Sequence, residues 1–244
     1  MSSNRPSSAA PAPTSHRGAR ACFALKGGTA INLFVRNLPR LSLDIDMMYL
    51  PVHNRPEALA GIDAAMKSIK AAALAELPGA RVTENIHDGA ILRLLVIAEG
   101  TQVELEVSPV LRGVVHEPST IPVTEAVEEA FGFAETSVVS FEDLFAGKLV
   151  AALERQHPRD LFDVQAVLAH EGLSDEGRDA FIIYLLSQNH PMGEVLSGRV
   201  KYLLSEYKNG FEGMTEDTIA PGRGTGDAGT GPAERVGGRG KTAP

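Results

Sequence analysis

The chain has 244 residues, a formal net charge of −8 and an apolar fraction of 43%. This length can bury a sizeable core and suits one domain, or one domain with a helical annex. No apolar run approaches the ~20 residues that span a bilayer, so no membrane contact is expected. The single cysteine, Cys22, excludes an internal disulfide framework and indicates a reducing compartment, with the cytoplasm as the default. The negative charge argues against broad nucleic-acid binding.

Residues 1–20 are rich in Ser, Ala and Pro, and they predict a disordered N-terminus. The sequence then presents Gly27, Gly28 and Thr29 before a short apolar run over residues 30–35. Glycines leave backbone N–H groups uncovered, and a helix that starts there can hold a phosphate. No Gly-Lys-Ser/Thr closes the loop, so the pattern is not a P-loop. Taken alone, such a triplet is more often a turn.

Residues 41–47 alternate between apolar and polar side chains, which predicts a strand. Ser42, Asp44 and Asp46 then share the face opposite the apolar side chains. Two neighbouring carboxylates repel each other unless a cation lies between them, and Mg²⁺ binds one or two carboxylates together with substrate phosphates. The alternative is an ordinary solvated strand face.

The next segments predict one helix and three strands, of which the last two form a hairpin. Their ranges are 55–77 for the helix and 81–87, 90–98 and 101–107 for the strands. Glu104 and Glu106 alternate with apolar residues in the last strand, and either can supply a third acid to the aspartates. Two exposed glutamates on a half-buried strand are the alternative.

The rest of the chain is predicted to be helical. Ser140 and Asp143 form a capping box that opens a helix to about Gln156. Lys148 and Arg155 fall on one stripe of this helix, and a separate leucine stripe is expected to face the core. The members of that leucine stripe are Leu144, Leu149 and Leu153.

A further helix begins at Arg159, with Asp160 and Asp163 in its first turns. Acidic residues stabilise a helix start, so a purely capping role is the alternative to a functional one. Two more helices are expected over residues 174–188 and 193–207. From residue 213 the sequence turns to Gly, Thr and Pro, which predicts a disordered tail.

Three separated motifs occur in an order that resembles the AbiEii/AbiGii nucleotidyltransferase toxins of the DNA polymerase β-like superfamily. The motifs are Gly27-Gly28-Thr29, Arg40-x-Ser42-x-Asp44-x-Asp46, and Lys148…Arg155…Arg159-Asp160-Leu161-Phe162-Asp163. The resemblance spans roughly residues 23–213. It implies an α/β or α+β fold, in which a mixed sheet is flanked by helices and followed by a C-terminal helical region.

The expected organisation has four parts. They are a disordered start (1–20), a nucleotidyltransferase-like domain (21–137), a helical region that completes the site (138–212) and a disordered tail (213–244). The resemblance implies a Mg²⁺-dependent toxin that transfers a nucleoside monophosphate from an NTP to an acceptor hydroxyl on RNA, such as a tRNA end. A winged-helix antitoxin is the implied partner. The alternative is a truncated, catalytically inactive homologue that binds nucleotide or RNA.

The same resemblance implies roles for individual residues. Asp44, Asp46 and Glu106 would hold Mg²⁺, while Lys148 would neutralise the triphosphate and Asp160 and Asp163 would orient Lys148 or the acceptor. The predicted nucleotide-binding residues are Gly27, Gly28, Thr29, Arg40, Ser42, Lys148 and Arg155.

Overall fold

The computed structural model describes residues 22–42, 44–197 and 201–215. The predicted disordered start, and the predicted tail beyond residue 215, lie outside the described residues. Within them, seven strands form one sheet. The strands are β1 (Phe23–Lys26), β2 (Asp44–Tyr49), β3 (Arg81–His87), β4 (Ala90–Ala98), β5 (Thr101–Arg112), β6 (Ser119–Pro122) and β7 (Glu135–Val138).

The strand order across the sheet is β3-β4-β5-β2-β1-β7-β6, and the sheet contains both parallel and antiparallel pairs. β2 lies parallel to β5 and antiparallel to β1, and β1 in turn lies parallel to β7. The remaining neighbours pair antiparallel. The predicted mixed sheet is therefore confirmed, and β2, which carries the aspartates, is a central strand.

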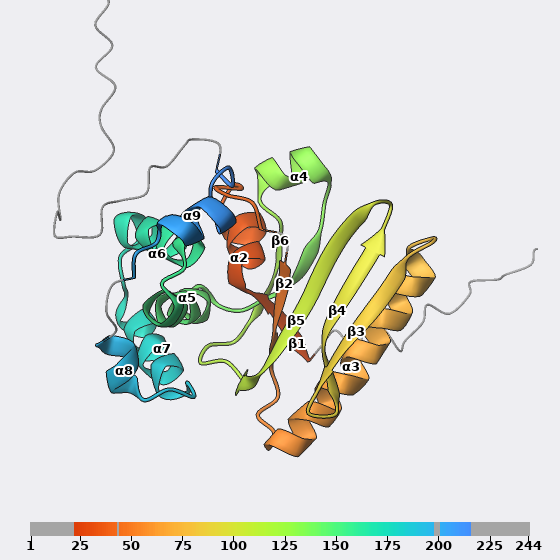
Figure 1. Ribbon diagram of the computed structural model, residues 1–244, viewed down its shortest axis with the longest axis horizontal. Helices are drawn as coiled ribbons and strands as arrows, with labels where there is room; N and C mark the ends of the chain where they lie inside the picture. The colour runs from red at the N-terminus through yellow and green to blue at the C-terminus, as the bar shows by residue number, and fades with distance from the viewer. Residues whose placement is uncertain (1–21, 43, 198–200, 216–244) are drawn as a thin grey trace, which may run out of the picture.

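Helices cover both faces of this sheet (Figure 1). Those in the described residues are α2 (Gly27–Ala30), the π-helical η1 (Ile31–Val35), α3 (Arg55–Glu76), α4 (Glu125–Phe131), α5 (Phe141–Arg155), α6 (Pro158–His170), α7 (Asp175–Leu186), α8 (Met192–Leu196) and α9 (Leu204–Gly210). No helix in the described part of the chain is long and apolar enough to cross a membrane.

Two hydrophobic cores hold the helices to the sheet. On one face, α3 packs Ile62 and Met66 against Leu94 of β4, and all three are fully buried. On the other face, α2, α5 and α7 pack around a second core that includes Met48 of β2 and Phe145 of α5. Each such side chain stabilises the fold by about 1.5–3 kcal/mol on burial. The second core joins residues from both sides of the boundary expected at 137/138, which falls inside β7 and stays a prediction.

Local signals located most elements correctly. Asn54 caps α3 by accepting a hydrogen bond from the Glu57 N–H at 3.1 Å, and the helix ends just before Pro78. Ser140 caps α5 by accepting from the Asp143 N–H at 3.0 Å, as the capping box predicts. The helix predicted over residues 55–77 and the Ser140 cap depend only on residues a few positions apart, and both are confirmed; the Asn54 cap is a finding of the structure.

The strand expected over residues 41–47 begins later and ends later than predicted. Its described part starts at Asp44, and Leu41 is 55% exposed instead of facing the core. The Leu41 N–H donates to the Met214 carbonyl at 2.8 Å, which takes this residue away from the sheet. β5 also continues beyond Val107 to Arg112.

The leucine stripe expected to face the core is partly wrong. Leu153 is 36% exposed, whereas Val150 and Ala152 are buried. The reason is that α5 contacts the sheet, α6 and α7, so its buried surface is wider than one stripe. Four short elements, β1, β6, β7 and α4, have too few residues to give a periodic signal, and their positions were not predicted.

The helix expected over residues 193–207 is also wrong. The described residues in this range form two short helices, α8 and α9, instead of one. The helix expected over residues 30–35 starts earlier, at Gly27, and its second half is π-helical.

Candidate functional site

Charged side chains form a row across four neighbouring strands, with two acids between two cations. Arg93 of β4 is paired with Glu106 of β5, Glu106 with Asp46 of β2, and Asp46 with Lys26 of β1. Residues in direct register point to the same face of a sheet. The pairing of β2 with β5 therefore brings the predicted third acid beside Asp46, as the sequence reasoning expected, and it adds two cations that this reasoning had not assigned.

Arg93 holds both glutamates of β5. Its Nε lies 2.9 Å from Glu104 Oε1, and its Nη2 lies 3.0 Å from Glu106 Oε2. Glu104 is in register with Asp44, one step along the strands from the Glu106–Asp46 pair. All four carboxylates thus share one face, and both glutamates are already neutralised in part by the same guanidinium.

The donor set fits a magnesium ion at the two aspartates. No three His, Cys, Asp or Glu side chains of the described residues are grouped so that they could hold a metal ion. Glu106 is paired with Arg93, and the three-carboxylate metal site stays a prediction. Asp44 and Asp46 remain as neighbouring oxygen donors on one strand face, and Mg²⁺ needs only one or two carboxylates besides phosphates and water.

Burial dominates the electrostatics of Lys26 and Asp46. It raises the pKa of Asp46, an effect that Lys26 and Lys148 oppose and that Glu106 reinforces. Burial likewise lowers the pKa of Lys26, although Asp46 and Glu106 favour its charged form. Each charged form is therefore costly in this protein environment. Such shifts are concentrated at functional sites.

Gly27 lets the backbone approach Asp46 closely. Its φ is +75°, and a Cβ placed there would overlap Asp46 Oδ2 and lie 2.9 Å from the Asp46 Cβ. A Cβ at Gly28 would lie 2.7 Å from both Arg40 Nη2 and Ser42 Oγ. A side chain at either position would therefore collide with its neighbours. The turn formed by the two glycines packs against Asp46 of β2 and against Arg40 and Ser42, which precede β2.

Thr29 fixes this turn to the start of β2. Its buried Oγ1 donates to the Asp44 carbonyl and lies 3.1 Å from Ser42 Oγ. Gly28, Thr29 and Ser42 do not line the cavity described below. Thr29 thus holds the start of β2 in place, and the phosphate-binding role of Gly28, Thr29 and Ser42 stays a prediction.

A second charged cluster joins α5 to α6. Lys148, 8% exposed, places its Nζ 2.8 Å from Asp160 Oδ1 and 3.1 Å from Asp163 Oδ2. Arg155 Nη2 lies 3.0 Å from Asp160 Oδ2. These contacts agree with the expectation that the two aspartates orient Lys148.

Arg40 is the third cation of this cluster, and the nucleotide-binding role predicted for it stays a prediction. It is 3% exposed, and it donates from Nε and Nη2 to the two oxygens of Asp163 at 2.8 and 2.6 Å. Its Nη1 donates to the Leu41 carbonyl at 2.8 Å. The guanidinium is occupied by the protein itself, so we assign Arg40 a structural role.

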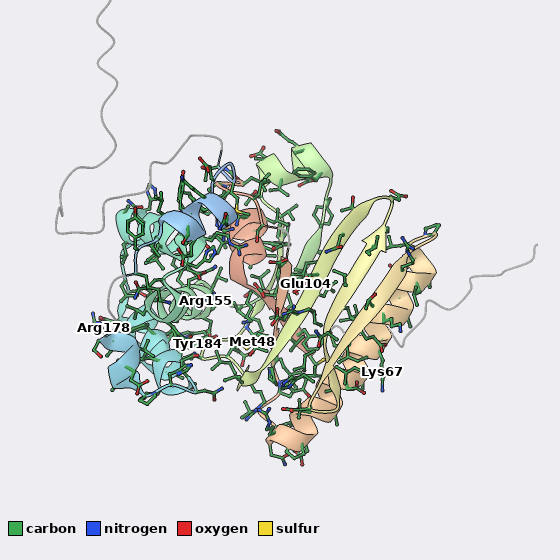
Figure 2. The ribbon with its side chains drawn as sticks, in the orientation of Figure 1. Met48, Lys67, Glu104, Arg155, Arg178 and Tyr184 are labelled. Atoms are coloured by element: carbon green, nitrogen blue, oxygen red, sulfur yellow. The ribbon has the colours of Figure 1, made fainter. Side chains whose placement is uncertain are left out.

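A cavity of about 340 Å³ lies between the sheet and helices α5 and α7. Five of the predicted site residues line it: Gly27, Asp46, Glu106, Lys148 and Arg155. Lys26 also lines it, whereas Asp44, Asp160 and Asp163 lie outside its lining. Figure 2 shows Arg155 and Tyr184 on the helical side and Glu104 on the sheet. Only the pairing of β1 with β2 could have identified Lys26, because its own four-residue strand carries no pattern.

Asp143 anchors the helical wall of the cavity. It accepts hydrogen bonds at 2.8 Å from the N–H groups of Val115 and His116, and from the hydroxyls of Ser140 and Tyr184. Burial, together with the nearby Asp143 carboxylate, raises the pKa of Tyr184 well above its ordinary range. The sequence predicted Asp143 only as part of a cap, yet its carboxylate connects α5 to α7.

The fold is similar to that of a solved toxin. MenT4, a nucleotidyltransferase toxin from Mycobacterium tuberculosis, aligns with a TM-score of 0.51 at 19% identity, over 73% of this chain and 64% of that chain. This chain therefore spans less than two thirds of that protein's length. JHP933 from Helicobacter pylori aligns with a TM-score of 0.44 at 18% identity, over 74% of this chain and 82% of that chain.

Sequence comparison provides the family. No curated protein matches the chain. The family model for the nucleotidyltransferase AbiEii toxins of type IV toxin–antitoxin systems matches residues 12–220, which is most of its length. With its mixed sheet and C-terminal helices, this chain belongs to the AbiEii nucleotidyltransferase toxin family.

Proposed function

We propose that this chain transfers a nucleoside monophosphate from an NTP to an acceptor hydroxyl and releases pyrophosphate, as the toxin of a toxin–antitoxin pair. One observation carries the proposal. Acids from two strands, Asp46 and Glu106, line the same cavity as the cations Lys26, Lys148 and Arg155. Phosphoryl transfer needs cations for the phosphates beside acids for a metal ion and for the acceptor.

The cluster on α5 and α6 carries an excess positive charge that can attract a phosphate. Lys148, Arg155 and Arg40 surround only two carboxylates, Asp160 and Asp163, so three positive charges against two negative ones leave one in excess. Lys148 and Arg155 line the cavity, which allows them to bind the β- and γ-phosphates of an NTP. Asp160 and Asp163 hold Lys148 in position as this happens.

The acids on the sheet have two roles in this proposal, one at the phosphates and one at the acceptor hydroxyl. Asp44 and Asp46 would hold a divalent cation such as Mg²⁺, which would neutralise charge on the phosphates. Glu106 faces the same cavity and can accept the proton of the acceptor hydroxyl. The hydroxyl oxygen forms a bond to the α-phosphorus, while the bond from that phosphorus to the pyrophosphate oxygen breaks.

The acceptor that we propose is the end of an RNA, such as a tRNA. The test incubates the full chain with each labelled NTP and either total RNA or purified tRNA, with Mg²⁺ or EDTA. Asp44→Ala or Asp46→Asn should lower incorporation about a hundredfold or more, the scale of losing one electrostatic contact to the transition state. Asp88→Asn is the matched control, because Asp88 lies in the β3–β4 turn and pairs with Arg55 on the surface.

Two results would contradict this proposal. Full incorporation by Asp46→Asn would remove Asp46 from the reaction. NTP binding without any transfer, in every RNA tested, would support the alternative of an inactive nucleotide- or RNA-binding homologue.

We further propose a protein antitoxin as the partner of this chain. Family membership supports this, since the family belongs to type IV toxin–antitoxin systems. Expression of the chain should arrest growth of a host cell, and co-expression of a winged-helix protein encoded next to it should relieve the arrest. Asp46→Asn should be harmless without that partner. If Asp46→Asn arrests growth as strongly as wild type does, the toxicity does not depend on nucleotide transfer.

A further inference from the structure

The helix α5 presents two different stripes to the cavity. Lys148 and Arg155 lie on one stripe, and both are held by aspartates of α6. Gly147, Ala151 and Glu154 recur at i, i+4 and i+7 on the adjacent stripe, and all three line the same cavity. The first stripe is cationic, whereas the second is uncharged at Gly147 and flat at Ala151, and it ends at the acidic Glu154.

Polar groups from two other elements border this flat stripe. α7 packs against it, because a Cβ at Gly147 would lie 3.4 Å from the Tyr184 ring. Gln188 follows α7, lines the cavity and donates one amide hydrogen to the Tyr184 carbonyl at 3.2 Å. Its carbonyl oxygen and second amide hydrogen can serve a ligand. Ser108 of β5 lines the cavity from the sheet side.

We infer that this second stripe binds the nucleobase of the NTP and that Gln188 selects which base is preferred. The inference rests on the proposed function, which places the phosphates on the neighbouring stripe. The Tyr184 ring covers Gly147, and a flat aromatic ring can lie beside it over Ala151, whose side chain is only a methyl group. A side-chain amide can distinguish nucleobases by hydrogen bonding, because each base presents its donors and acceptors in a different order.

The test measures binding without turnover, using the full chain. Each of the four α,β-methylene nucleoside triphosphates is titrated by calorimetry in Mg²⁺, because the methylene group blocks transfer. Inorganic tripolyphosphate is titrated in parallel as a ligand with phosphates and no base. The variants are Gln188→Leu and Ala151→Leu, with Gln165→Leu as the matched control on the exposed side of α6.

In wild type, the affinities for the best-bound and the worst-bound nucleotide should differ by some ratio. Gln188→Leu should reduce this ratio of affinities about tenfold, the usual effect of one hydrogen bond. Ala151→Leu fills the flat stripe and should weaken all four nucleotides about tenfold or more. Neither variant should change the affinity for tripolyphosphate, and Gln165→Leu should behave as wild type.

Failure of this inference can be told apart from failure of the proposed function. Wild-type protein that binds nucleotides, together with a Gln188→Leu variant whose four affinities are unchanged, would overturn the base-reading role alone. Equal losses for tripolyphosphate and nucleotides would show that Gln188 and Ala151 support the phosphate site instead. If wild-type protein binds neither ligand, both the inference and the proposed transfer reaction are wrong.

Discussion

Gly27 determines how closely the backbone approaches the acids, and its replacement gives a sharp test. Gly27 and Gly79 have nearly the same φ, +75° and +74°, but only Gly27 has Asp46 within reach of a Cβ. Gly79→Ala should cost about 1–2 kcal/mol of unfolding free energy, the cost of a left-handed alanine. Gly27→Ala should cost about 1–3 kcal/mol more, because the new Cβ overlaps the carboxylate. Urea denaturation measures both, and equal losses would show that the contact with Asp46 relaxes freely.

Arg40 and Arg36 form ion pairs of the same length in different surroundings. The Nη2–carboxylate distance is 2.6 Å in both, but the Arg40–Asp163 side chains are only 2% and 1% exposed, against 24% and 36% for Arg36–Glu171. Arg40→Gln should destabilise the fold by about 3–5 kcal/mol, because it leaves a buried carboxylate short of its partner. Arg36→Gln should change stability by about 1 kcal/mol or less.

Thermal and urea unfolding of the two arginine variants distinguish the structural role of Arg40 from the nucleotide-binding role predicted from the sequence. An Arg40→Gln variant that keeps its stability but loses NTP affinity would support the nucleotide-binding role.

The ion pairs of Asp160, which join α6 to α5, make the free energy of unfolding depend on pH. Burial raises the pKa of Asp160, but Lys148 and Arg155 outweigh burial and hold that pKa below the ordinary 3.8. A carboxyl whose pKa is lower in the folded state stabilises the fold above its unfolded pKa. This stabilisation is lost as the pH falls through the folded pKa. Wild type should therefore lose part of its advantage over Asp160→Asn below about pH 3.8.

Unfolding free energies of both proteins between pH 6 and pH 2.5 provide this measurement. A constant difference across that range would mean that the carboxylate of Asp160 adds no stability through its charge, and that its hydrogen bond to Lys148 acts as a neutral contact.

The C-terminal part of the chain contributes to the fold as far as α9, and two truncations test this. Tyr207 and Phe211 are buried, and the Phe211 ring centroid lies 5.5 Å from that of Phe162 in α6. A chain ending at residue 203 loses both side chains, and each is worth about 1.5–3 kcal/mol on burial. Its melting temperature should fall by several degrees, since about 1 kcal/mol corresponds to 2–4 °C for a protein of this size.

A chain ending at residue 215 is the control for this truncation. Residues 216–244 lie outside the described residues, and their Gly, Thr and Pro content predicts that they add nothing to the core. Their removal should leave the melting temperature unchanged. A clear loss would mean that these residues pack against the fold, and the composition argument would be wrong.

The sequence by itself determined the features that depend on near neighbours. The cap at Ser140, the β4–β5 hairpin and the shared face of Asp44 and Asp46 all follow from residues one to four positions apart. Motif order alone also identified the family, because three short motifs in a fixed succession are specific even where each one is weak.

Only the tertiary structure decided which polar groups are free to act. Arg40 meets Asp163 across 123 residues of sequence, and Lys26 meets Asp46 only through the pairing of β1 with β2. Both cations stand in the same short stretch as the motifs, yet one is occupied by a buried carboxylate and the other faces the cavity. The physical reason is that a charged side chain can act on a ligand only where the fold lets it face a cavity, and long-range packing determines where that is.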